Sequence, residues 1–258
     1  MKKIGLGATA FAAAVLMSST AAAATSPVFE TDYGAAVTGG DDQTVGGSLP
    51  FAFSFFGQTY TTFDASTNGF VSLGGGNGSG CCNGSVGDFL NGAARIAPEW
   101  FDIVGTVYLN TAVGDRAVFT WVGGEYGGGG SYAAQAQLFA NGDIIFGYSG
   151  DSVPNRHTTL TGISAGGGVA DPGETDLTGA AFSTGANRAV YDLAAANTFD
   201  LNGRNVYFTA DGRGGYTVSN DPVAGVPEPA TWGLMLSGFF GAGAILRGRR
   251  ARQRLLEA

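Results

Sequence analysis

The sequence predicts an all-β protein whose main region, residues 25–222, folds as an antiparallel β-sandwich or a jelly-roll-like pair of sheets. Short runs of alternating apolar residues recur along this region, and Gly-rich turns separate them. Hydrophobic residues make up 44% of the chain, with 18 Phe, so a core can form despite the 45 Gly and the low charged fraction of 13%.

Two segments give the clearest strands. In LPFAFSFFG, residues 49–57, the residues that alternate on one face are Leu49, Phe51, Phe53 and Phe55. In DRAVFTWVG, residues 115–123, both faces are apolar or β-branched, which predicts a central strand.

Turn residues divide the remaining strands. YAAQAQLFANGDIIFGY, residues 132–148, predicts a hairpin around Asn141-Gly142, and Asn68-Gly69 predicts a second tight turn. RNVYFTA, residues 204–210, indicates a late strand. The only helical pattern of this region is short, RAVYDLAAAN at residues 188–197.

The N-terminus is typical of a secretory signal peptide, residues 1–24. Lys2 and Lys3 precede an apolar run that ends at Met17, and small residues lead to a predicted cleavage site after Ala24. The apolar run is too short for a permanent membrane helix. We therefore expect export through the Sec machinery and removal of the leader by signal peptidase.

The C-terminal segment, residues 223–258, predicts a single transmembrane helix. Residues 230–246 carry no formal charge and as a helix would span roughly 25 Å, the short end of what crosses a bilayer. Trp232 would lie at the outer interface. Under the positive-inside rule a basic tail would stay in the cytoplasm, and its arginines are Arg247, Arg249, Arg250, Arg252 and Arg254.

A stiff, extended segment, Pro227-Glu228-Pro229, comes directly before this helix. VPEPATW, a Gly-rich apolar helix and then RGRR resemble the PEP-CTERM sorting signal of exopolysaccharide-producing Gram-negative bacteria. The resemblance implies that exosortase, an integral-membrane enzyme, recognises Pro227, Glu228 and Pro229 and removes the helix. The protein would be anchored in the inner membrane for a time and then reach the cell surface or the extracellular matrix. A permanent single-pass anchor is the alternative.

Between Thr25 and Val226 there are 19 Asp and Glu against six Arg and no Lys, a net charge of −13. Such a surface repels nucleic acid and anionic lipid. It is compatible with bound divalent cations without requiring them.

A second resemblance covers about residues 48–150. A Phe-rich strand, the Thr-Asn-Gly turn, the segment RIAPEWFDI at 95–103 and the final Asn-Gly-Asp hairpin follow one another as in nidogen-like extracellular β domains. This sequence departs from the pattern by Glu99 between Pro98 and Trp100 and by a Gly-rich insertion at 74–87. The resemblance implies an adhesive or structural role and brings no catalytic residues.

The only two cysteines, Cys81 and Cys82, are adjacent in a Gly-rich loop. In an oxidising compartment they are candidates for a vicinal disulfide, while an intermolecular link and free thiols stay open. There is no C-x-x-C motif for redox catalysis and too few ligands for a thiolate metal site.

The other candidate groups are isolated. His157, the only histidine, lies in a loop and is expected to be a surface or hydrogen-bonded residue. A calcium site would need six to eight oxygens, and the segment DPGETD supplies only three weak candidates, Asp171, Glu174 and Asp176. No cofactor is expected beyond this calcium.

Two further patterns involve aromatic residues. Glu99 and Asp102 flank a Trp-Phe pair and are therefore a candidate carboxylate pair for glycoside hydrolysis. Positions three apart on a strand face opposite ways, so we favour a structural segment with Trp100 in the core. In the Gly-rich linker 123–132, Tyr126 and Tyr132 are candidates for stacking on sugar rings.

The sequence thus predicts a non-enzymatic surface or matrix protein associated with exopolysaccharide. The alternative from a different class is a secreted glycoside hydrolase, or another hydrolase, that acts on matrix polysaccharide.

Overall fold

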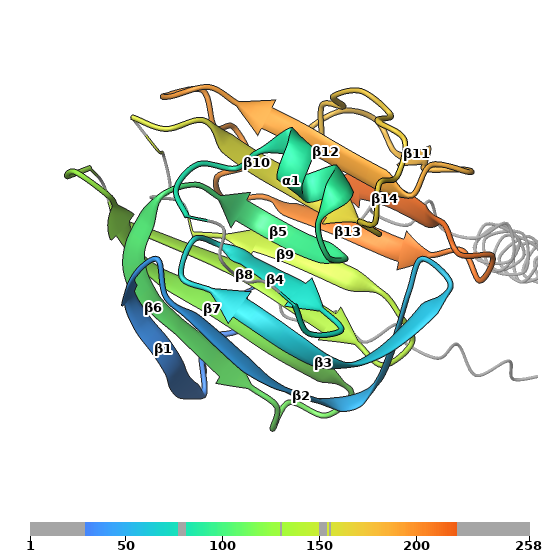
Figure 1. The fold of residues 1–258 in the computed structure, drawn as a ribbon, viewed down its shortest axis with the longest axis horizontal. Helices are drawn as coiled ribbons and strands as arrows, with labels where there is room; N and C mark the ends of the chain where they lie inside the picture. The colour runs from blue at the N-terminus through green and yellow to red at the C-terminus, as the bar shows by residue number, and fades with distance from the viewer. Residues whose placement is uncertain (1–28, 77–80, 130, 150–153, 155, 221–258) are drawn as a thin grey trace, which may run out of the picture.

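The computed structural model describes residues 29–76, 81–129, 131–149, 154 and 156–220. These residues form two sheets that face each other, with antiparallel pairing throughout (Figure 1). The all-β sandwich predicted from the sequence is confirmed. The predicted leader 1–24 and the predicted helix 230–246 lie outside the described residues, within which no helix has the length and apolarity to span a bilayer.

The larger sheet has eight strands and contains the first and the last strand of the described chain. Both terminal strands therefore belong to one layer. In spatial order it consists of β1 (Ala35–Asp41), β6 (Ile103–Asn110), β7 (Arg116–Glu125), β8 (Ser131–Phe139), β9 (Ile144–Tyr148), β13 (Asn205–Ala210), β14 (Tyr216–Asn220) and β11 (Phe182–Ser183).

The smaller sheet has six strands, and one short helix, α1 (Val86–Asn91), lies on its outer side (Figure 1). Its spatial order is β12 (Ala189–Ala194), β10 (Thr159–Ser164), β5 (Arg95–Trp100), β4 (Phe70–Leu73), β3 (Gln58–Ser66) and β2 (Thr44–Phe55).

The main core fills the space between the sheets, as the alternating patterns predict. Phe53 and Phe55 of β2 are buried, and Phe119 of β7 stacks edge-on against Phe63 with ring centroids 4.8 Å apart. Strand β7 lies between β6 and β8, which confirms its central position. The predicted hairpin of residues 132–148 is β8–β9, and the predicted late strand is β13.

Trp100 is buried as expected, but on the other side of the smaller sheet. It packs in a second cluster with Phe70 and with Phe89 of α1. The Arg95 guanidinium lies 4.4 Å from the ring centroids of both Phe70 and Trp100, and burial lowers its pKa to about 10. A register shift between β5 and β10 causes this placement, because it inserts one extra residue into β5 before Trp100.

One local prediction was wrong, and one short helix was not predicted. The helix expected at 188–197 is strand β12, because Val190 and Tyr191 pair with β10 and tertiary pairing overrides the Ala-rich propensity. The helix that does form, α1, begins in the last two residues of the Gly-rich insertion. Ser85 caps it by accepting a hydrogen bond from the Asp88 amide, and buried Phe89 and Leu90 hold it to the sheet.

The turn between β3 and β4, residues 67–69, confirms the predicted Asn-Gly turn and lies directly against β5. Gly69 has a φ of +81°, and the Glu99 amide donates a hydrogen bond to its carbonyl oxygen at 3.4 Å. A Cβ atom at this position would overlap the Glu99 carbonyl oxygen. Glycine is therefore required here, because it adopts a positive φ without strain and has no Cβ atom to overlap Glu99.

We expect Gly69→Ala to destabilise the domain by more than about 3 kcal/mol, since it adds a backbone clash to the cost of a left-handed conformation, about 1–2 kcal/mol. Gly128 is the matched control, because its φ is +91° but nothing lies within 4 Å of an added Cβ. Gly128→Ala should show only the conformational cost. Urea denaturation of the 25–222 segment measures both. Equal losses would show that the contact with β5 is unimportant.

Candidate functional site

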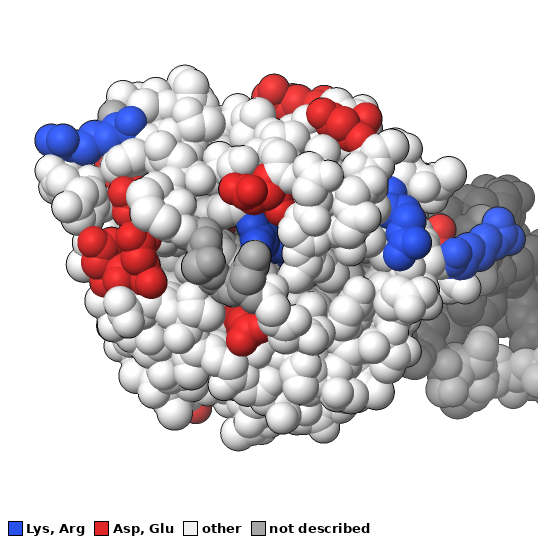
Figure 2. All heavy atoms as spheres, viewed as in Figure 1, with Lys and Arg blue, Asp and Glu red and all other residues white. Residues whose placement is uncertain are grey.

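Acidic side chains gather at one end of the sandwich, at the left of the face shown in Figure 2. Asp41 ends β1, Asp42 lies in the turn that follows, Asp102 joins β5 to β6, and Glu125 ends β7. The register brings them to one level, because Asp41 is opposite Val104 and Glu125 is opposite Ile103. We call Asp41, Asp42, Asp102 and Glu125 the acidic end.

A buried amide holds this end together. Asn68, fully buried in the β3–β4 turn, donates from Nδ2 to Asp42 Oδ1 at 2.7 Å. Its Oδ1 accepts the Ile103 amide hydrogen at 3.0 Å. Asp42 has a left-handed backbone, φ 51°, which Asp tolerates better than most residues. The Asn68 side chain thus fixes the Asp42 carboxylate relative to the start of β6.

Three of these carboxylates converge. One oxygen each from Asp41, Asp42 and Asp102 lies within 4.8 Å of the others. Asp102 is only 8% exposed, its carboxylate accepts no hydrogen bond within the described residues, and its oxygens keep contact with solvent. Burial raises the pKa of Asp102, and the charges of Asp42, Asp41 and Glu125 raise it further, while His157 acts in the opposite direction.

The fourth carboxylate has partners of its own. Glu125 Oε1 accepts hydrogen bonds from the backbone amides of Arg156 and His157, at 2.7 and 2.8 Å, and contacts His157 Nδ1 at 2.7 Å. His157 is therefore a hydrogen-bonded loop residue, as expected. The contact fixes the loop that precedes β10 to the end of β7.

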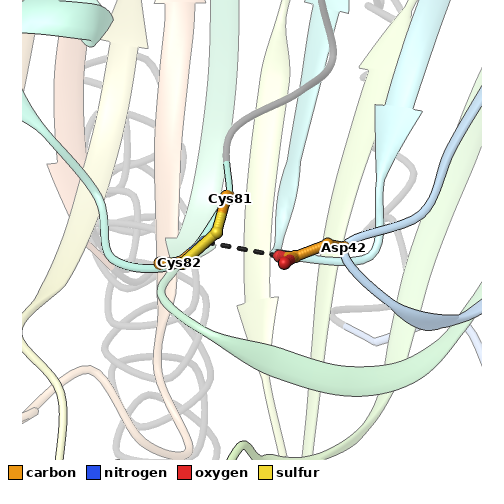
Figure 3. Close-up of side chains that lie close together, drawn as sticks. All are labelled: Asp42, Cys81 and Cys82. Atoms are coloured by element: carbon orange, nitrogen blue, oxygen red, sulfur yellow. Dashed lines mark hydrogen bonds between the residues drawn. A yellow bond between two sulfur atoms is a disulfide. The ribbon is translucent and has the colours of Figure 1, made fainter.

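Cys81 and Cys82 adjoin the same end and are disulfide-bonded in the structure (Figure 3). The Cys82 amide donates to Asp42 Oδ1 at 3.4 Å, drawn as the dashed line in Figure 3. Together with Asp42 they form another group whose ligand atoms lie within 4.8 Å. Because both sulfurs are used in the bridge, this group offers no thiolate to a metal.

One exposed aromatic residue lies beside the acidic end. Tyr126 is 50% exposed, and its amide donates to the Asp102 carbonyl oxygen at 3.0 Å. Tyr132, the other tyrosine proposed for sugar stacking, is 4% exposed and packs against Phe101 in the core. Of these two tyrosines, Tyr126 alone can therefore offer a ring face to a ligand.

Glu99, the other half of the suspected hydrolase pair, is fully buried, and neither of its carboxylate oxygens has a hydrogen-bond partner. Burial raises its pKa well above the ordinary value. Burial raises the pKa of Tyr132 and Tyr148 as well, and an ionised Glu99 would raise both pKa values further. A carboxyl group in this position cannot reach a polysaccharide, so the geometry gives no support to glycoside hydrolysis by Glu99 and Asp102.

A family model described as NIDO related matches residues 17–210. The chain belongs to the NIDO-related family. The nidogen-like resemblance seen over residues 48–150 is thereby confirmed and extends over most of the β-sandwich. Comparison with curated proteins and with solved structures gives no match.

The calcium candidates of this NIDO-related domain are placed apart from the acidic end. Asp171 and Asp176 are exposed and accept hydrogen bonds in their own turns, from Gly173 and from Thr178. With Glu174 they form none of the three-carboxylate groups found among the described residues. The sorting residues Pro227, Glu228 and Pro229, the arginine tail and Ala24 lie outside the described residues.

No pattern in the sequence indicates that Asp41, Asp42, Asp102 and Asn68 meet. Asp41 and Asp42 lie at the end of β1, and Asp102 follows β5, two strands that the sequence patterns did not predict.

We expect Glu99→Gln to stabilise the NIDO-related domain at pH 7. The folded state keeps Glu99 protonated while the unfolded state loses that proton above about pH 4.5. The folded state then binds more protons, so wild-type stability falls as the pH rises, by up to about 1.4 kcal/mol per pH unit. The variant should lack this component between pH 5 and pH 7 in urea titrations.

The exposed Glu174, substituted in the same way, serves as the control and should leave the pH dependence unchanged. Parallel pH curves for wild type and Glu99→Gln would contradict a buried neutral carboxyl group.

Proposed function

We propose that this is an exported, non-catalytic protein of the cell surface or extracellular matrix, sorted through its C-terminal segment and associated with exopolysaccharide. Exosortase would act at Pro227-Glu228-Pro229 after export through the Sec pathway and removal of residues 1–24. Membership of the NIDO-related family, the acidic surface and the order of the C-terminal motifs support this proposal.

The position of the last strand carries the sorting part of the proposal. β14 ends at Asn220, whose Nδ2 donates to the carbonyl oxygens of Leu177 and Gly179, both at 2.8 Å. Only residues 221–226 separate this strand from Pro227. Cleavage at the motif would therefore remove no strand and no core residue of the described sandwich.

The intact mass of the mature protein from its native host tests the processing. We expect a chain that begins at Thr25 and ends near Pro229, with two hydrogens fewer than the sequence mass because Cys81 and Cys82 are bridged. Added glycan would give excess mass. Replacing Pro227 and Pro229 with Ala should retain the tail, because the extended recognition segment is lost.

Pro222→Ala is the matched control, since it removes a proline outside the motif and should leave processing unchanged. A mature mass that includes everything through Ala258 would contradict sorting, and the protein would then be permanently anchored.

The surroundings of Tyr126 carry the binding part of the proposal. An exposed aromatic ring next to a group of fixed polar side chains provides an apolar face for a sugar ring and oxygen atoms for its hydroxyl groups. Tyr126 follows Glu125 directly, so His157 and its loop border the same surface.

Retention on immobilised exopolysaccharide from the host tests the binding. We expect the mature protein to be retained without releasing reducing ends, and Tyr126→Ala to weaken retention about tenfold, equivalent to roughly 1.4 kcal/mol. Val104→Ala is the control, because Val104 is 43% exposed on the adjacent strand but is not aromatic. Release of reducing ends would favour a hydrolase, and retention unaffected by Tyr126→Ala would exclude this surface.

A further inference from the structure

We propose that Asp41, Asp42 and Asp102 form a binding site for one divalent cation of the calcium type. Neither the family match nor the sequence pattern places a metal there. The inference goes beyond the proposed function, because it concerns the carboxylates themselves and is tested without any glycan.

The spacing of the carboxylates fits one ion. Calcium lies about 2.3–2.6 Å from its oxygen ligands, so two oxygens on the same ion are at most about 5 Å apart. The three aspartate oxygens lie within 4.8 Å of one another. They come from two connections, the β1–β2 turn and the β5–β6 junction, which the fold holds side by side.

The burial of Asp102 points to a missing partner. The residue is only 8% exposed and its carboxylate accepts no hydrogen bond within the described residues, although its oxygens keep contact with solvent. Asp41 is half-buried as a residue, but its Oδ1 atom is excluded from solvent and has no hydrogen-bond partner. Buried carboxylates are normally paired, hydrogen-bonded or bound to a metal, because an uncompensated buried charge is costly. A bound cation would compensate both groups at once.

Asp42 is positioned for the same ion. Asn68 Nδ2 and the Cys82 amide both donate to Oδ1 of Asp42, which leaves Oδ2 without a donor in the described part of the chain. The hydrogen bonds therefore orient the carboxylate and keep one oxygen free. Ligands held in this way bind an ion with little reorganisation.

The groups around the three aspartates select the type of ion. Glu125 adds negative charge, and its Oε1 is engaged by Arg156 and His157. The Nδ1 atom of His157 faces Glu125, and the sulfurs of Cys81 and Cys82 are bonded to each other. The available ligands are therefore carboxylate oxygens, which suit hard cations such as calcium rather than zinc or copper.

Thermal unfolding of the full chain in neutral detergent, with calcium chloride or with a chelator, tests the site. At a calcium concentration about 100 times the dissociation constant we expect the wild-type midpoint to rise by about 5–10 °C. Asp102→Asn should unfold at a higher temperature than wild type in chelator, because it removes one of three mutually repelling carboxylates. It should lose most of the rise caused by calcium.

This reversal of sign separates an ion site from a structural role, since a purely structural Asp102 would give the same difference in both buffers. Asp41→Asn provides a second variant if Asp102→Asn does not fold. Asp176→Asn is the control, because Asp176 is exposed and lies outside the cluster, and it should keep the full rise. Calorimetric titration with calcium chloride should show one site in wild type.

No calcium-dependent rise and no heat of binding at millimolar calcium would overturn the proposal. A rise that Asp102→Asn and Asp41→Asn retain in full would overturn it as well. Loss of glycan retention with intact calcium binding would affect only the proposed function.

Discussion

One buried side-chain amide determines how the two sheets meet at the acidic end. Asn68 belongs to the smaller sheet, but it accepts a hydrogen bond from Ile103 at the start of β6 in the larger sheet. Through Nδ2 it also holds Asp42, in the connection from β1 to β2. Because the amide is fully buried, its hydrogen-bonding groups cannot be satisfied by solvent. The relative position of three connections follows from this residue.

The rest of the domain separates apolar packing from polar chemistry. Aromatic and aliphatic side chains fill the space between the sheets, and a smaller cluster with Arg95 lies under α1. The carboxylates of the acidic end collect where strands end, whereas Glu99 enters the core at the extra residue of β5. The ionised form of Glu99 and the ionised carboxylates of the acidic end are therefore destabilised by different effects. Glu99 is excluded from solvent, whereas each carboxylate of the acidic end has neighbours of like charge.

The sequence predicts what depends on local pattern. Alternation identified β2 and β7, and Asn-Gly pairs identified the turns at residues 68–69 and 141–142, because neighbouring residues determine both. Contacts made across the fold could not be predicted. The partners of the Asn68 amide lie 26 and 35 residues away, and β12 looks helical until β10 pairs with it. The burial of Asp102 likewise depends on strands brought together only by folding.

The arrangement of β14 has a mechanical consequence. If the tail beyond Asn220 is attached to a membrane or a matrix, tension enters the sandwich at the end of β14, where Asn220 is paired with Val206. A pull from that end would open the β13–β14 ladder one hydrogen bond after another, which requires less force than shearing the whole ladder at once. The two hydrogen bonds from Asn220 Nδ2 to Leu177 and Gly179 lie ahead of that ladder. A load on the tail must therefore break the two hydrogen bonds of the Asn220 side chain before it reaches the ladder.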